Sequence, residues 1–487
     1  MNRPIRKVTL VCAVLFAALL INANWVQVAD QHSLKQQPTN TREIAARLDR
    51  LRGQLLAGPA DDRVAMASSV PVDDEFKYLR QYSNGPLYAP VTGYFTLYSA
   101  TALEQSENLF LNGDDDRLLA SKISALFDGS GRKGGYVLTT IDPKIQQAAA
   151  DALGGRPGAV VAMDPRTGAI LAMVTAPSYD PNQLASHNTT QVTQAYNTLN
   201  ADKNSPLLNR ATQQTYPPGS TFKLITAAAA LSTGQYTPDS VLPAPNELQL
   251  PQSTATLRNF GGESCGNGQT STMIHALTIS CNTAFASLGM QIGGDKLRAQ
   301  ADAFGFGSTI DGLELPEAKS VFPDSVDQAQ TAQSAIGQFD VRVTPLQMAQ
   351  VVSAIANRGR MMKPYVVDEL EGPDLRQIAR TQPKELGQPI SSQVADQLIT
   401  MMKSVVTSGT GTKAQISGVS VAGKTGTAEH GANEPPHAWF VGFAPADNPS
   451  IAVAVVVENG GPESGTGGSV AAPIAQKVMQ TALDVRG

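Results

Sequence analysis

The sequence predicts an α+β protein preceded by a membrane-spanning helix, and three observations lead to this prediction. An uncharged stretch at residues 8–29 follows a short basic N-terminus. Strand and hairpin patterns occur before residue 178 and again after residue 418, while helical patterns dominate from residue 207 onward between them. A helical pattern at 471–483 closes the chain. Strands and helices that are segregated, rather than strictly alternating, are typical of α+β folds.

Residues 8–29, VTLVCAVLFAALLINANWVQVA, carry no charge. At ~1.5 Å per residue, a helix of this length crosses the ~30 Å hydrocarbon layer. Three basic residues lie within residues 1–7, and basic residues stay on the cytoplasmic side. We therefore expect a cytoplasmic tail at 1–7, a single-pass anchor in the cell membrane at 8–29, and the rest outside. A cleaved signal peptide is the alternative, but its apolar region is usually ~7–15 residues, and Ala-Asn-Trp at 23–25 is a poor cleavage site.

The 487 residues suggest two to four domains. A polar linker at 31–40 follows the anchor, and strand and turn patterns continue from there, including a hairpin expected at Tyr82–Phe95. The flexible stretch DGSGRKGG ends at residue 135. We therefore expect a small β-rich, non-catalytic domain at 30–135, of a pedestal or dimerisation type, and a second domain at 136–487.

The charge and the spacing of cysteine and histidine residues exclude some classes of function. The net charge of −5, without a basic stripe, argues against nucleic acid as a partner. No C-x-x-C or H-E-x-x-H spacing occurs, so we expect no metal site.

The second domain begins with a strand and a helix that opens at Pro143, because proline fits the first helical turn. A hairpin follows at 158–177, with Gly168 in its turn. Strand patterns return after residue 418. We expect one antiparallel sheet that joins the early hairpin to these late strands, with helices on both sides and an all-helical subdomain.

Ser220 and Lys223 follow Pro-Pro-Gly at the start of a helical pattern. Residues three apart share a helix face, so Lys223 lies beside Ser220. A lysine in an apolar setting, near another cation, loses its proton more easily and can then accept the serine proton. An isolated S-x-x-K is common by chance, and an ordinary surface helix is the alternative until partners are found.

Two partner motifs follow along the chain. Ser280 and Asn282 flank Cys281 at a break between helical patterns. Lys424-Thr425-Gly426-Thr427 lies in a strand pattern, where Thr425 and Thr427 share one face and Lys424 takes the other. Gly426 has no side chain, so a substrate backbone could approach there. Three motifs in this order, each in a suitable local structure, favour a serine nucleophile served by lysines.

Cys265 and Cys281 lie outside the membrane in this topology, where disulfides persist. We favour a disulfide that pins the intervening loop against the cleft, and two buried thiols are the alternative. Cys281 as a nucleophile competes poorly with Ser220.

The sequence resembles the class B penicillin-binding proteins from the anchor onward. The resemblance is carried by the three motifs and by LTTIDPKIQQAA, NRATQQTYPPGSTFK, IGQFDVRVTPLQMA, AGKTGTAE and AWFVGFAP. The N-terminal stretch LYAPVTGYF is most similar to the actinobacterial subgroup called penicillin-binding protein A. The resemblance implies the fold of the penicillin-binding and serine β-lactamase transpeptidase domain. Cys281 stands where Asp is common in relatives.

The resemblance also implies a role for each motif residue. Ser220 would attack the D-Ala–D-Ala bond of a peptidoglycan stem peptide, with Lys223 as general base. Ser280 would relay a proton to the leaving group, and Lys424 would tune the field. The implied substrate-binding residues are Asn282, Thr425, Gly426 and Thr427, and the implied oxyanion hole is the backbone N–H groups of Ser220 and Thr427.

The implied activity is D,D-transpeptidation through an acyl-enzyme, which requires no metal or organic cofactor. The implied partners are peptidoglycan stem peptides, β-lactam antibiotics and membrane-bound cell-wall synthesis proteins. A β-lactam sensor or scaffold is one alternative, although sensors carry several membrane spans. A D,D-carboxypeptidase or β-lactamase is another, because water and an amine follow the same first half-reaction.

Overall fold

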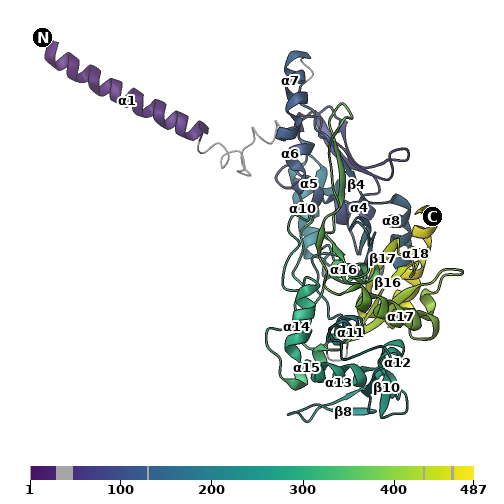
Figure 1. Cartoon of the computed structure of the whole chain (residues 1–487). Coiled ribbons are helices and arrows are strands. Elements are labelled where there is room, and N and C mark those ends of the chain that lie inside the picture. Colours follow the sequence, from purple (N-terminus) through teal and green to yellow (C-terminus); the bar gives the residue numbers. More distant parts are fainter. Residues whose placement is uncertain (1, 29–47, 129–130, 432–433, 462–464, 487) are drawn as a thin grey trace.

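The computed structural model describes residues 2–28, 48–128, 131–431, 434–461 and 465–486 (Figure 1). Helix α1 (Asn2–Val28) contains an exposed apolar span, Pro4–Trp25, that is long enough to cross a membrane. The span overlaps the expected anchor at 8–29 as far as Trp25, and the helix itself continues to Val28. Residue 29 and the expected polar linker lie outside the described residues.

A five-stranded antiparallel sheet in the order β15-β16-β17-β5-β6 forms the centre of the chain from residue 140 onward. This part contains the three motifs and is called the catalytic half below, and the described residues from 48 to 139 are called the N-terminal half. The hairpin β5–β6 pairs through β17 with the last strands of the chain, which confirms the sheet expected from the sequence. Helix α8 opens with Pro143 at its first position, as expected, and Asp142 caps it. The strands are β5 (Gly158–Met163), β6 (Ile170–Ala176), β15 (Ala422–Ala428), β16 (His437–Ala444) and β17 (Ile451–Val457).

Helices cover both faces of this sheet because alternate side chains of each strand point to opposite faces. On β5, Val160 packs with α8 (Pro143–Leu153) and α18 (Ala472–Arg486), which cover one face. Val161 faces the second core cluster, which includes α16 (Pro345–Ala356) and further helices. Every residue of the central strand β17 is buried, as expected for a strand covered on both sides.

A six-stranded sheet in the order β13-β12-β4-β1-β2-β3 organises the N-terminal half. Its strands β12 and β13 come from the catalytic half of the sequence. Strand β4 pairs in parallel with β1 and antiparallel with β12, so it lies between segments far apart in the chain. The strands are β1 (Leu55–Ala57), β2 (Val64–Pro71), β3 (Tyr78–Tyr82), β4 (Tyr136–Thr139), β12 (Val367–Glu371) and β13 (Gln377–Arg380).

The expected hairpin at Tyr82–Phe95 is wrong. Strand β3 ends at Tyr82, and Gly85–Thr92 forms helix α4. Asn84 turns the chain in the left-handed region, and a proline in the first turn suits helix initiation. The helix buries Tyr88 and Val91 in the main core, so tertiary burial outweighs the Gly and Pro pattern that suggested turns. Helices α5 (Ala102–Ser106), α6 (Asn108–Leu111) and α7 (Leu119–Asp128) follow.

The expected helical region lies beyond the five-stranded sheet, at the end of the body opposite α7 (Figure 1). It also contains two short antiparallel ribbons that the sequence did not predict, β7–β10 and β8–β9. Its helices are α11 (Lys223–Ser232), α12 (Met273–Thr278), α13 (Asn282–Ile292), α14 (Gly294–Ala303) and α15 (Gln328–Ser334), with α17 (Ser392–Ser408) alongside; the ribbon strands are Val241–Pro243, Thr270–Thr272, Glu247–Gln249 and Thr256–Arg258.

Candidate active site

Ser220 lies in a single 3₁₀ turn, η2 (Gly219–Phe222), which leads directly into α11. The α-helix therefore begins at Lys223, three residues later than the expected start. Residues three apart eclipse one another in a 3₁₀ turn, so Ser220 and Lys223 still share a side. Gly219 has a φ of 53°, and a Cβ there would lie 3.0 Å from the carbonyl oxygen of Thr427. The serine turn thus packs directly against strand β15.

The second motif lies at the junction between α12 and α13, where the sequence indicated a break. Ser280 has a φ of 63°, which is uncommon for a residue other than glycine and marks a constrained position. The Nζ of Lys223 donates to the Ser280 carbonyl oxygen at 2.7 Å and to Oδ1 of Asn282 at 2.7 Å. The left-handed turn at Ser280 thus lets its carbonyl oxygen and the Asn282 side chain serve the same ammonium group.

The third motif occupies β15 beside these groups. The Nζ of Lys424 donates to Ser280 Oγ at 2.8 Å and to the Thr425 carbonyl oxygen at 2.8 Å. The Nζ of Lys223 is 3.4 Å from the same Ser280 Oγ. Ser280 therefore links the two lysines, and the fold brings the three motifs together. Thr427 is half-buried at the edge of this group.

Gly426 contacts the chain itself. A Cβ at this position would lie 3.0 Å from both the Pro218 carbonyl oxygen and Thr221 Cγ2. A side chain here would therefore push β15 away from the turn that carries Ser220. The glycine allows the close approach between strand and turn that places Lys424 next to the serine motifs.

Both lysines are fully buried. Burial lowers the pKa of Lys223 well below its ordinary value, and the charge of Lys424 lowers it further. Burial lowers the pKa of Lys424 to about 7. In the described part of the chain, the hydrogen-bond partners of both ammonium groups are neutral oxygens. The site is thus arranged to hold Lys223 as a neutral amine that can accept a proton.

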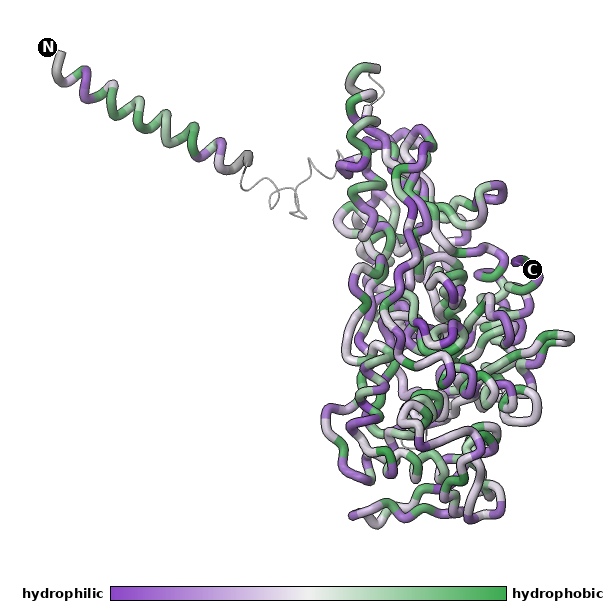
Figure 2. The backbone as a smooth tube through the Cα atoms, in the orientation of Figure 1, coloured by the Kyte–Doolittle hydropathy of each residue, from purple (hydrophilic) through white to green (hydrophobic). Residues whose placement is uncertain are grey.

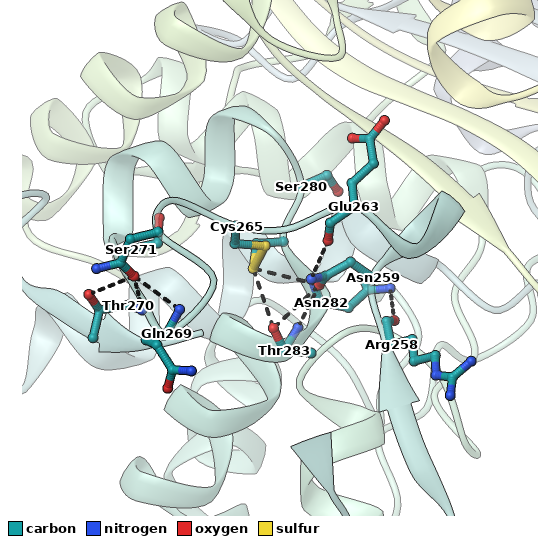
Figure 3. The surroundings of a disulfide bond; sticks show 12 residues. Arg258, Asn259, Glu263, Cys265, Gln269, Thr270, Ser271, Ser280, Asn282 and Thr283 are labelled. Carbon is teal, nitrogen blue, oxygen red and sulfur yellow. Dashed lines mark hydrogen bonds between the residues drawn. A yellow bond between two sulfur atoms is a disulfide. The ribbon is translucent and has the colours of Figure 1, made fainter. Parts of the chain in front are cut away.

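A loop from Arg258 to Cys265 supports the second motif, as Figure 3 shows. Cys265 and Cys281 form a disulfide with a Cα–Cα distance of 6.1 Å. The Oδ1 of Asn259 accepts hydrogen bonds from the backbone N–H groups of Asn282 at 2.9 Å and Thr283 at 3.1 Å. This amide satisfies free N–H groups at the start of α13, in place of a capping side chain from the helix itself.

Sequence reasoning missed Asn259 and Thr410. The Oγ1 of Thr410 forms a 2.6 Å hydrogen bond with Oγ1 of Thr425, which is buried and 5% exposed. Thr410 therefore fixes the hydroxyl rotor of a motif residue. Neither residue belongs to a motif. Asn259 lies 23 residues from Asn282 and Thr410 lies 15 residues from Thr425, so no short spacing in the sequence connects them.

Hydrogen bonds also hold the residues that precede Ser220. Trp439 Nε1 donates to the Pro217 carbonyl oxygen at 3.1 Å, and the Tyr216 hydroxyl donates to Glu458 Oε1 at 2.7 Å. Gly219 N–H donates to the Gly337 carbonyl oxygen at 2.9 Å. These contacts come from three distant segments, so the position of Ser220 depends on the complete catalytic half.

His437 is a hydrogen-bonded histidine at the start of β16. Its Nδ1 accepts from the Asn459 N–H at 3.1 Å, and its ring stacks on His430 with centroids 3.8 Å apart. Burial, together with His430, lowers the pKa of His437 to about 3. The imidazole is therefore neutral near pH 7 and packs edge-on against Tyr216.

Comparisons with known proteins agree with this geometry. The model of the penicillin-binding protein transpeptidase domain matches residues 158–480, and that of the penicillin-binding protein A dimerisation domain matches residues 52–137. The chain is 48% identical to peptidoglycan D,D-transpeptidase PbpA of Mycolicibacterium smegmatis and 45% identical to PbpA of Mycobacterium tuberculosis, in each case over 99% of both chains.

Solved structures of penicillin-binding protein A from M. tuberculosis have the same fold. The penicillin G acyl-enzyme complex gives a TM-score of 0.84 at 47% identity over 89% of this chain and 100% of that one. The ceftriaxone acyl-enzyme complex gives 0.86 at 46% identity over 90% and 99%.

Proposed function

The chain belongs to the penicillin-binding protein transpeptidase family, and from that premise we propose that it is a peptidoglycan D,D-transpeptidase that β-lactams acylate. One observation carries the proposal. Lys223 and Lys424 are buried together around Ser280, and their described hydrogen-bond partners are uncharged oxygens. This arrangement suits proton transfer from a serine, whereas a structural ion pair would hold both charges in place.

The first half-reaction begins when Ser220 Oγ attacks the carbonyl carbon of the penultimate D-alanine. Neutral Lys223 Nζ takes the hydroxyl proton, and the backbone N–H groups of Ser220 and Thr427 receive the developing oxyanion. Removing one such donor typically costs about 3–4 kcal/mol at the barrier. Ser280 then passes its hydroxyl proton to the nitrogen of the leaving D-alanine as the peptide bond breaks, and it takes back the proton that Lys223 accepted. Lys223 is then neutral again, and an ester to Ser220 remains.

Substrate orientation uses the remaining motif groups. Lys424, while protonated, attracts the terminal carboxylate of the stem peptide, and the hydroxyls of Thr425 and Thr427 donate to it. The Asn282 amide binds the peptide backbone and holds Lys223 in place. A β-lactam presents a carboxylate next to a strained amide, so it enters the same position and acylates Ser220.

In the second half-reaction an amine of a neighbouring stem peptide attacks the ester. Its proton returns through Lys223, and Ser220 leaves as the free hydroxyl while the cross-link forms. The apolar span of α1 anchors the chain in the membrane with the catalytic half outside, next to the peptidoglycan and to other cell-wall synthesis proteins.

The test uses the full-length chain in detergent. It is incubated with a labelled penicillin, and separately with a D-Ala-D-Ala thioester analogue and an amine acceptor. We expect a stable adduct on Ser220, loss of that adduct in Ser220→Ala, and aminolysis in excess of hydrolysis. Rapid release of hydrolysed penicillin would favour a β-lactamase, and hydrolysis of the thioester despite the amine would favour a carboxypeptidase.

A further inference from the structure

Helix α7 carries an apolar face that the described residues leave uncovered. Leu119, Ile123 and Phe127 recur every four residues and so lie on one side of the helix. Their exposed fractions are 58%, 47% and 89%. Large apolar side chains grouped on one face mark an interaction surface more often than scattered ones do. We call these three residues the α7 face.

The α7 face lies where the chain arrives from the anchor. Leu48 is the first described residue after α1. Close to it in sequence, Arg50 Nη1 pairs with Asp114 Oδ1 at 2.8 Å. Lys122 of α7 donates to the Asp114 carbonyl oxygen at 2.6 Å. Figure 1 shows α7 at one end of the body, with the β8 ribbon at the other, and Figure 2 shows hydrophobic turns in α7.

The separation from the anchor is limited by covalent reach. Residues 29–47 join α1 to the body, and whatever their path they span at most ~65 Å. The start of α7 therefore stays near the membrane in which α1 is anchored. The bilayer is the apolar phase that this covalent link keeps close to the α7 face.

We propose that the α7 face docks into the interfacial region of the outer membrane leaflet, an inference that rests on the proposed anchoring of α1. Interfacial helices bury an apolar face ~5–10 Å into the headgroup and acyl boundary, and Leu, Ile and Phe are suited to this. The charges around α7 are mixed. Arg132 pairs with Asp114, Arg117 pairs with Asp115, and Lys122 lies 3.7 Å from Asp116. Docking therefore depends on apolar burial and does not require anionic lipid.

The test places a tryptophan at the α7 face of the full-length chain. A Trp25→Phe background removes the anchor indole and leaves Trp439, which is buried. Phe127→Trp is made in that background and reconstituted at one chain per nanodisc, with lipids brominated near the headgroup. Phe260→Trp is the matched control, because Phe260 is a 65% exposed phenylalanine two residues after β9, the partner strand of β8, which lies at the opposite end of the body from α7.

We expect brominated lipid to reduce the emission of Trp at 127 about twofold, as for a side chain at the interfacial depth, and to leave Trp at 260 unchanged. Adding Leu119→Ser and Ile123→Ser should restore the emission. The melting temperature of each variant reports that it is folded.

Equal emission with and without bromine at both positions would overturn the docking, as would protection of position 127 that develops only with two chains per disc or with an added protein. Quenching at position 260 as strong as at 127 would also overturn it, because the contact would then be non-specific. Failure of the chain to co-elute with the discs would overturn the anchor and the docking together, which separates that result from a failure of the docking alone.

Discussion

Each half of the molecule contains a pair of buried basic side chains, and the two pairs have different partners. In the N-terminal half, Arg52 and Arg80 share the carboxylate of Glu104 at 2.6 Å each. In the catalytic half, Lys223 and Lys424 share the hydroxyl of Ser280. All four cationic side chains are almost completely buried. The N-terminal group therefore retains its charges, whereas Lys223 in the catalytic group is arranged to lose its proton.

The pKa directions express this difference. Burial alone would raise the pKa of Glu104, but the charges of Arg80 and Arg52 outweigh it and leave the pKa below its ordinary value. Burial lowers the pKa of Arg52 to about 10, so it remains charged at neutral pH. Lys223 has no such partner among its described contacts, and its pKa falls well below its ordinary value. A shared carboxylate stabilises buried charge, whereas a shared hydroxyl prepares proton transfer.

The largest effect is expected for Lys223→Met. This variant removes the proposed base, and general base catalysis contributes about 10²–10⁴-fold, so acylation by labelled penicillin should slow by about 10⁴-fold. The melting temperature should hold or rise, because a buried amine without a charge partner is replaced by an apolar side chain of similar shape. Acylation rates and thermal melts are measured on the same preparation. Normal acylation in this variant would contradict the role of Lys223.

Glu104→Gln should show the opposite pattern. It leaves Arg52 and Arg80 buried without their carboxylate, which typically costs about 3–5 kcal/mol of unfolding free energy. The folded fraction should still acylate at the normal rate. The matched control is Asp396→Asn, which breaks the exposed pair with Arg358 and should cost at most about 1 kcal/mol. Equal unfolding free energies of the two variants in urea would show that burial does not distinguish the two ion pairs.

The pH dependence of acylation tests the catalytic group alone. Lys223 must be neutral to accept a proton, so the rate should fall about tenfold per pH unit below its depressed pKa. Lys424 must be charged to attract the carboxylate, and its pKa is about 7, so the rate should also fall above that value. Lys424→Arg should move the upper limb to higher pH because guanidinium stays protonated. An unchanged upper limb in this variant would assign the limb to another group.

Folding stability should respond to the same groups with a defined sign. The pKa of Lys424 is lowered from 10.5 to about 7 on folding, so between these values the unfolded chain binds more protons. Stability therefore rises with pH from about 7 toward 10. Lys424→Met should reduce the slope of this part of the stability curve, because Lys223 also has a lowered pKa and supplies the rest of the slope, and Glu104→Gln should leave the slope unchanged. Urea titrations at pH 7, 8 and 9 measure it, and a wild-type curve that falls over this range would contradict the shift.

The smallest effect is expected at Thr410. Thr410→Val removes the hydroxyl that pairs with Thr425, a net loss of about 1 kcal/mol, or roughly fivefold. The weakening should affect penicillin affinity before acylation rather than the limiting rate, since Thr425 is proposed to bind the carboxylate. Thr410→Ser keeps the hydroxyl and should behave as wild type. Equal losses in both variants would point to packing instead of the hydrogen bond.

The sequence was sufficient for the parts of the fold and site that depend on local patterns. Pro143 opens α8, the 158–177 hairpin forms, and the spacing of Ser220 and Lys223 places them on one side whether the turn is 3₁₀ or α. These features follow from backbone preferences within a few residues.

The parts that the sequence did not reveal depend on distant partners. Helix α4 forms where Gly and Pro suggested a hairpin, because Tyr88 and Val91 are buried in the core. Asn259 and Thr410 orient motif residues through side chains that no spacing rule connects to them. The partner of β4 is β12, more than two hundred residues later, and only the folded chain brings these strands together.

Strand exchange between the halves has a mechanical consequence. Because β12 and β13 extend the sheet that begins with β1, force applied at the anchor passes through backbone hydrogen bonds into the catalytic half. The backbone hydrogen bonds of β4 to β1 and to β12 join the two halves and oppose a rotation of one half against the other. In the proposed docking, the α7 face rather than the length of residues 29–47 would set the height of Ser220 above the membrane, and the shared sheet would carry the catalytic half with it.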